Sequence, residues 1–229
     1  MPDPGPAPHR LTDVPGNGSP PNEPGPAPPH TRTQRASRRG YVEAGLEILV
    51  ADGPPGLTIA ALCASLGTTS GSFYHHFGNL HGYTQAVVRH WETRHADQMR
   101  SLGQSDGTAS TRMLRHRGAI LALDHPIDAV MRSWAASDPI VAAAQQRVDE
   151  LWHSALFALL HDLIGEAGTA RRLAVFGRSV VIGYQLVTST RHHGELDALL
   201  ADFEQTVRDH YRTEPADLTI SKETPCREP

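Results

Sequence analysis

The chain of 229 residues lacks the features that mark secreted, membrane-embedded and disulfide-stabilised proteins. It has only two cysteines, Cys63 and Cys226, too few for a disulfide framework or a zinc knuckle. No apolar run reaches the roughly 18 residues that a transmembrane helix needs. The N-terminus also has no basic segment followed by an apolar one, as a secretory signal would. We therefore expect a cytoplasmic protein with no membrane partner.

An excess of basic charge is also missing, because the formal net charge is −4 at pH 7. A nucleic-acid partner is not excluded, since phosphate contacts depend on local basic groups and not on the total charge. One local cluster, Arg32, Arg35, Arg38 and Arg39, lies just before and at the start of the first expected helix. It is either a solvated helix entry or a surface that contacts phosphate.

Sustained strand alternation is absent too, and helical spacing of apolar residues predicts an all-α protein of about nine helices. Residues 1–31 alternate proline with small and polar residues, so we expect a disordered tail, and the polar segment 213–229 predicts a second one. Two of the expected helices are short and lie between Thr58 and Phe77. Glycine and proline breaks separate the other seven, over 38–51, 80–100, 112–123, 127–136, 140–164, 169–190 and 195–212.

The stretch from Thr58 to Phe77, TIAALCASLGTTSGSFYHHF, predicts two short helices joined by a tight turn. Thr58 can cap the first helix with its hydroxyl, and Gly67 follows where a left-handed residue usually ends a helix. Thr69 or Ser70 can cap the second helix. This is the layout of a helix-turn-helix, whose second helix is presented to the major groove of DNA.

The run GSFYHHF, which ends at Phe77, resembles the core of the DNA-binding domain of the tetracycline-repressor (TetR) family of transcriptional regulators. The resemblance covers about residues 33–95. It implies a DNA-binding domain over 32–79 and a larger helical domain for effector binding and dimerisation over 80–212. It also implies transcription regulation by a repressor that binds a palindromic double-stranded DNA operator as a homodimer and responds to an unidentified small molecule.

The resemblance places the DNA contacts around the second short helix. Short polar side chains and backbone amides at a helix N-terminus suit base edges and phosphates. The expected DNA-binding residues are Arg38, Thr58, Thr68, Thr69, Ser70, Gly71, Ser72, Tyr74, His75 and His76. Leu80 departs from the family pattern, which usually has a lysine there. The absence of this lysine predicts weaker sequence-independent affinity for DNA. It also predicts that the salt dependence of DNA binding has a slope smaller by roughly one.

The larger helical part offers apolar side chains with a few polar ones, which suits a small-molecule cavity, although plain core packing explains each of them as well. The candidate ligand-binding residues are Met99, Met113, Leu121, Met131, Trp134, Trp152, His153 and Phe176, with His116 and Gln185 as further polar candidates. In the resembled family the last two long helices pair with their mates. The implied dimer interface contains Val180, Tyr184, Val187, Leu199, Phe203 and Val207.

Two other classes of protein compete with this interpretation. The fourteen histidines invite a metal-dependent hydrolase. However, neighbours such as His75 and His76 point about 100° apart on a helix and cannot readily share an ion. The sequence has no nucleophile elbow, phosphate-binding glycine loop or HExxH motif, so we expect no enzyme, no catalytic residues, no metal and no cofactor. A helical scaffold or signalling protein without DNA binding stays the alternative.

Overall fold

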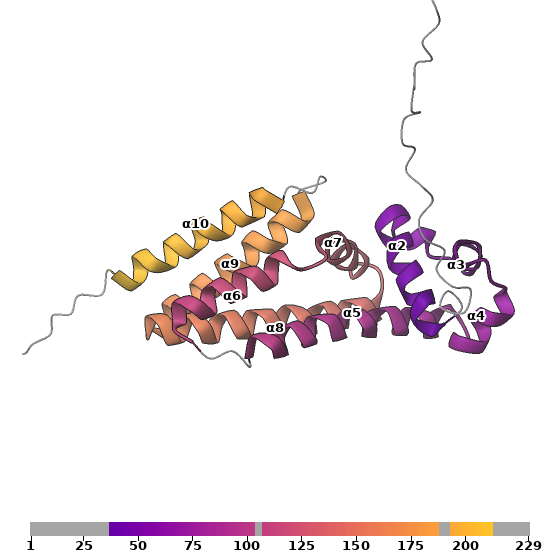
Figure 1. Cartoon of the computed structure of the whole chain (residues 1–229), viewed down its shortest axis with the longest axis horizontal. Helices are drawn as coiled ribbons and strands as arrows, with labels where there is room; N and C mark the ends of the chain where they lie inside the picture. The colour runs from indigo at the N-terminus through magenta and orange to yellow at the C-terminus, as the bar shows by residue number, and fades with distance from the viewer. Residues whose placement is uncertain (1–36, 104–106, 188–192, 213–229) are drawn as a thin grey trace, which may run out of the picture. The chain divides into compact units, whose positions relative to one another are not determined.

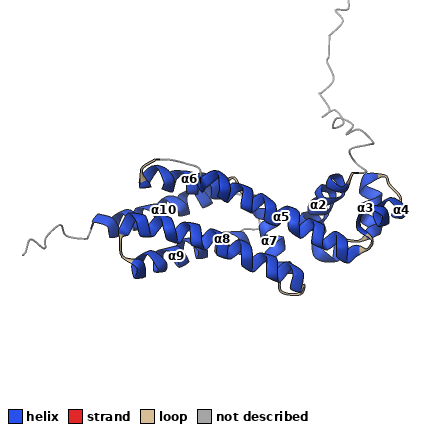
Figure 2. Ribbon diagram, turned by 90° about the horizontal axis from the view of Figure 1, so that it is seen from below, coloured by secondary structure: helices blue, strands red, loops and turns tan. Residues whose placement is uncertain are grey.

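The computed structural model describes residues 37–103, 107–187 and 193–212, and within them the regular structure is entirely helical (Figure 1). Figure 2 shows these helices joined by short loops, with no strand in the described ranges. The nine helices there are α2 (Arg38–Gly56), α3 (Ile59–Leu66), α4 (Ser70–Phe77), α5 (Leu80–Gly103), α6 (Ala109–Leu121), α7 (His125–Trp134), α8 (Pro139–Ile164), α9 (Ala167–Val187) and α10 (His193–Arg212). The predicted all-α fold of about nine helices is confirmed.

Some sequence predictions fall on other parts of the chain. The tails over 1–31 and 213–229, together with Arg32, Arg35 and Cys226, lie outside the described residues. None of the helices in the described ranges is both long and apolar enough to cross a bilayer.

The helix ends follow the local chemistry that the sequence indicated. The Thr58 hydroxyl accepts a hydrogen bond from the Ala61 N–H at 3.1 Å and caps α3. Gly67 then ends α3 in the left-handed region, with φ 61°. The first helix is longer than predicted, since α2 continues to Gly56 beyond a break at Gly53, where φ is 68°. Two prolines follow Gly53, and proline is tolerated in the first turn of a helix.

A cluster of aromatic rings packs α2, α4 and α5 together. Phe73 and Phe77 of α4 contact Tyr41 of α2 at ring-centroid distances of 5.8 and 5.6 Å, and Phe77 lies 4.9 Å from Tyr83 of α5. The buried Tyr83 hydroxyl donates a hydrogen bond to the Tyr41 carbonyl oxygen at 2.7 Å. These contacts hold α4 against α2 and α5.

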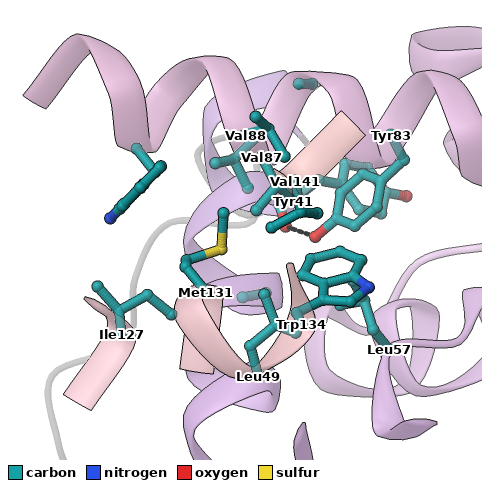
Figure 3. Packing of buried hydrophobic residues seen from close by; sticks show 14 of the residues in the cluster. Tyr41, Leu49, Leu57, Tyr83, Val87, Val88, Ile127, Met131, Trp134 and Val141 are labelled. Atoms are coloured by element: carbon teal, nitrogen blue, oxygen red, sulfur yellow. Dashed lines mark hydrogen bonds between the residues drawn. The ribbon is translucent and has the colours of Figure 1, made fainter. Parts of the chain in front are cut away.

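The same buried cluster extends into α7 and α8. Figure 3 shows Ile127 and Met131 of α7 near Leu49 of α2, with Val141 of α8 in the same cluster. Ile127, Met131 and Leu49 are almost fully buried. The helices that carry the DNA-binding candidates therefore share one hydrophobic core with the helices that follow them.

Candidate nucleic-acid interface and ligand cavity

Helix α4 has one buried and one exposed face. Phe73 and Phe77, four residues apart, have exposed fractions of 0% and 8% and lock one face into the aromatic cluster. Tyr74 is 51% exposed, and Ser70 and His75 are also exposed. With Gly71, which is exposed as well, these residues form the accessible face of the second helix of the helix-turn-helix.

The turn before α4 uses its hydroxyl groups for structure. The Thr69 hydroxyl accepts a hydrogen bond from the Ser72 N–H at 3.4 Å and caps α4. The half-buried Thr68 hydroxyl lies 2.8 Å from the Tyr41 hydroxyl and ties the turn to α2. Thr58, as the cap of α3, is likewise engaged with backbone. Among the candidate DNA contacts, Thr58, Thr68 and Thr69 therefore also shape the motif.

The basic candidates lie beside the end of α4. The exposed Arg38 side chain donates a hydrogen bond to the His76 carbonyl oxygen at 3.2 Å, and its guanidinium lies 5.1 Å from the Phe77 ring centre. This cation–π contact holds a positive charge next to the motif. Arg39 instead pairs with Glu43 at 2.7 Å, so its charge is balanced locally. Leu80, at the start of α5, is 39% exposed.

A cavity of about 70 Å³ lies between α5, α6, α7, α8 and α9. Indole and imidazole rings form part of its wall, including Trp91, His95, His116 and Trp152. Burial lowers the pKa of His116 to about 4, so this ring is neutral at pH 7. The polar part of the wall comes mainly from α7, α8 and α9 and includes Asp128, Arg132, Gln145, Asp149, Arg178 and Gln185.

A buried carboxylate organises one side of this cavity. Asp128, only 5% exposed, accepts hydrogen bonds from the Trp91 indole N–H at 2.8 Å and from His95 Nε2 at 3.1 Å. The Trp152 indole N–H donates to His95 Nδ1 at 3.0 Å. Because an indole can only donate, His95 carries its proton on Nε2 and donates it to Asp128. One carboxylate thus orients three aromatic wall residues.

A second carboxylate, Asp149, organises another part of the wall. The Arg132 guanidinium binds Asp149 through two hydrogen bonds, at 2.8 and 2.9 Å. Burial, the largest single effect, raises the pKa of Asp149, but the hydrogen bonds and charge of Arg132, together with Gln145 and Arg178, outweigh it and hold the pKa below its usual value. The Gln145 amide also donates to Asp149, at 3.1 Å. This side of the cavity is therefore built around a half-buried ion pair.

Only part of the predicted ligand-binding set lines this cavity. Trp152, His116 and Gln185 do. The remaining candidates lie elsewhere: Met131 and Trp134 are buried in the cluster with α2, Met113 packs in a second cluster, Leu121 packs in a third, Met99 borders a separate groove, Phe176 is 46% exposed, and His153 does not line the cavity. These seven candidates therefore lie outside the cavity.

Sequence reasoning missed most of the polar wall. Asp128 and Arg132 are charged residues four apart in a short apolar segment, and that spacing was a usable signal for one face of a helix. Trp91 and His95 show the same spacing on α5. Nothing local indicated that these two pairs meet, since Asp128 and His95 are 33 residues apart.

The candidate dimer residues separate into two groups. Tyr184, Phe203 and Val207 are buried within the protomer, at 8%, 5% and 4% exposed, so they have little surface left for a partner. Val187 and Leu199 are exposed, at 83% and 43%, and Val180 is half-buried. The described ranges contain no group of three or more His, Cys, Asp or Glu side chains that could hold a metal ion.

A helix-turn-helix whose second helix presents an exposed polar face, in an all-α chain, defines a DNA-binding transcriptional regulator. The family described as bacterial regulatory proteins, tetR family, matches residues 42–79, from α2 to just beyond α4. Residues 42–79 therefore form a DNA-binding domain of the tetR type. None of the curated protein sequences is significantly similar to the chain.

Solved structures share the fold at low sequence identity. A transcriptional regulator from Rhodococcus sp. RHA1 is 17% identical with a TM-score of 0.64, covering 76% of this chain and 96% of its own. A Saccharomonospora viridis transcriptional regulator in complex with choline is 13% identical with a TM-score of 0.63, covering 73% and 95%. The reduced form of E. coli NemR is 18% identical with a TM-score of 0.61, covering 73% and 95%. At these identities the similarity establishes the fold.

Proposed function

We propose that the protein is a ligand-responsive repressor that binds a palindromic DNA operator as a homodimer and reads it with α4. The exposed face of α4 carries this proposal, because Phe73 and Phe77 anchor the helix while Ser70, Tyr74 and His75 remain accessible. A helix held in this way can enter the major groove as a rigid unit. The proposed mode of action is binding, with no catalytic step.

Phosphate contacts would come from the edges of the motif. The first-turn amides of a helix attract phosphate, and the exposed N-terminus of α4 offers such groups. Arg38 lies beside the other end of α4, where the ring of Phe77 positions its charge. Tyr74, at the middle of the exposed face, suits a contact to the DNA backbone. With Leu80 in place of a lysine, we expect few other cationic contacts next to the motif.

A dimer interface on α9 and α10 is supported by exposed apolar side chains. Phe176, Val180 and Val187 lie four and seven residues apart, so they form one stripe along α9. Gly183 falls within the stripe and has open space around it, which would allow a second helix to approach closely. Leu199 adds an exposed apolar side chain from α10. Such a patch on a protein surface favours association.

The cavity is the proposed effector site, and α5 and α7 connect it to the DNA-binding helices. Ile127 and Met131 of α7 pack in the cluster with α2, whereas Asp128 and Arg132 of the same helix line the cavity. A ligand that favours one position of α7 would therefore favour one position of α2 and α4. The choline complex of the S. viridis regulator supports small-molecule binding by this fold.

The DNA-binding proposal is tested by selecting binding sites from a random pool of duplexes. The expected result is two inverted half-sites whose centres lie about one helical turn or a multiple of it apart. Binding should weaken steeply with salt. Recovery of no enriched sequence, at any salt concentration, would contradict the proposal and favour the scaffold alternative.

The dimer is tested by light scattering with size exclusion on the Val180→Glu, Val187→Glu double variant. Two buried charges should disfavour association, so we expect a monomer where the wild type is a dimer. Leu114→Glu is the matched control, because Leu114 is 61% exposed on α6, outside the proposed stripe. A double variant that elutes as the wild-type dimer would place the interface elsewhere.

A further inference from the structure

Two glutamine oxygens in the cavity meet no hydrogen-bond donor from the described part of the chain. The Gln185 amide nitrogen donates to Asp128 Oδ2 at 3.3 Å, and the Gln145 amide nitrogen donates to Asp149 Oδ1 at 3.1 Å. A carboxylate only accepts, so each one fixes the amide with its oxygen as the remaining polar atom. Neither Oε1 atom finds a donor among the described residues, although Gln145 and Gln185 are only 7% and 9% exposed.

Two guanidinium donors in the same wall are also unpaired. The Nε–H groups of Arg132 and Arg178 are buried and meet no acceptor in the part of the chain that is described. Both residues line the cavity with the two glutamines. A buried polar group without a partner is costly, so a bound molecule that supplies the missing partners binds more tightly. The cavity is therefore best matched by a ligand that has both a hydrogen-bond acceptor and a hydrogen-bond donor.

The charges in the wall balance one another. Asp128 and Asp149 contribute two negative charges, and Arg132 and Arg178 contribute two positive ones. The buried His116 ring is neutral at pH 7, since burial lowers its pKa to about 4. His95 is neutral as well, because its Nδ1 accepts from Trp152. An ionic ligand would bring an uncompensated charge into a neutral site, which is costly.

We propose that this cavity recognises an uncharged amide group, with the ligand carbonyl accepting from arginine Nε–H and the ligand N–H donating to glutamine Oε1. The inference rests on the proposed function only in treating the cavity as the effector site. At about 70 Å³ the cavity is smaller than the roughly 150 Å³ cavity that holds benzene in an engineered protein. A planar group of about four heavy atoms is therefore the appropriate probe.

Four probes of nearly identical shape separate the possible chemistries. Acetamide has both an acceptor and a donor, acetone has only an acceptor, acetate is an anion and acetamidinium is a cation. The full-length protein is titrated with each probe while the indole N–H signals of Trp91 and Trp152 are followed by NMR. Trp134, which packs outside the cavity in the cluster with α2, serves as an internal control. Each signal is assigned with a Trp→Phe variant.

Acetamide should bind at least about tenfold more tightly than the other three probes, since each of them leaves buried groups unpaired or adds a charge. Gln145→Met should weaken acetamide binding by a similar factor, whereas Gln146→Met, at an exposed position on the same helix, should not. If Gln145→Met does not fold, Arg178→Met tests the same site. Tightest binding of acetate or acetamidinium, equal binding of acetone, or no cavity shift with any probe would overturn the inference.

DNA affinity measured in the same samples keeps the two proposals separate. Selective binding of acetamide without any effect on DNA affinity would support the amide site and count against its role as the effector site. DNA release by acetate or acetamidinium, with acetamide inactive, would support the effector site and overturn the amide assignment.

Discussion

Replacing His116 should remove a specific part of the pH dependence of stability. His116 lies on α6, is 6% exposed, and contacts the Trp152 ring edge-on at a centroid distance of 5.6 Å. Burial lowers its pKa from 6.5 to about 4. The unfolded chain therefore binds a proton at this residue more tightly than the folded protein does. The stability that neutral His116 permits is complete above pH 6.5 and is lost as the pH falls towards 4.

The two pKa values give the size of the effect. Between pH 7 and pH 5 the proton taken up by the unfolded chain lowers the free energy of unfolding by about 2 kcal/mol through this one residue. His116→Phe keeps a ring against Trp152 and cannot titrate. We therefore expect the loss of stability between pH 7 and pH 5 to be about 2 kcal/mol smaller in the variant than in the wild type.

The assay is urea unfolding of both proteins at pH 7 and pH 5, at one protein concentration, because the proposed dimerisation would make stability depend on concentration. The other titrating groups are common to both proteins and cancel in the comparison. An equal loss of stability in wild type and variant would refute the reasoning, since it would mean that burial does not disfavour the charged form of His116.

The remaining predictions concern the backbone of the helices and are read from thermal or urea unfolding. Gly45→Ala would place a methyl group on the Tyr83 hydroxyl, so we expect a loss of at least about 1–3 kcal/mol. Gly118→Ala, with open space around it on α6, should instead stabilise by up to about 1 kcal/mol, and equal effects at the two positions would contradict this account. Thr69→Ala removes the acceptor for the Ser72 N–H and should cost about 1 kcal/mol, which an unchanged midpoint would contradict.

The helix-turn-helix could be predicted because its determinants are local. The cap of α3 at Thr58, the left-handed Gly67 and the cap of α4 at Thr69 each act within a few residues, and the structure has all three. The predicted first helix ends too early, at residue 51, because the glycine and prolines that follow also indicate a local stop. Gly53 does interrupt the helix, but Pro54 and Pro55 then begin another turn instead of ending the element.

Most of the cavity wall could not be predicted because it is assembled from five helices. Asp128 gains its role by meeting Trp91, His95 and Gln185, which lie 37, 33 and 57 residues away. No sequence spacing carries that information. The large apolar residues that looked suitable, such as Met131, instead fill the core beside α2.

The predicted dimer interface was also only partly accessible from the sequence. An amphipathic pattern indicates which residues of a helix face the same way, but not whether that face covers the protomer's own core or a partner. On α10 the inward face contains Phe203 and Val207, which are buried in the protomer. On α9, only the folded chain shows that Phe176 and Val187 are exposed whereas Tyr184 is buried.

Recognition of DNA by α4 is tested most directly by the DNA affinity of Tyr74→Ala. Binding of the wild type and the variant to duplex DNA from upstream of its own gene is followed by fluorescence anisotropy. Leu114→Ala serves as an exposed control on α6. The account predicts salt-sensitive, sequence-selective binding that weakens in Tyr74→Ala but not in the control, while both variants keep the wild-type fold and oligomeric state. Unchanged affinity in Tyr74→Ala would contradict the assignment of α4 as the recognition helix.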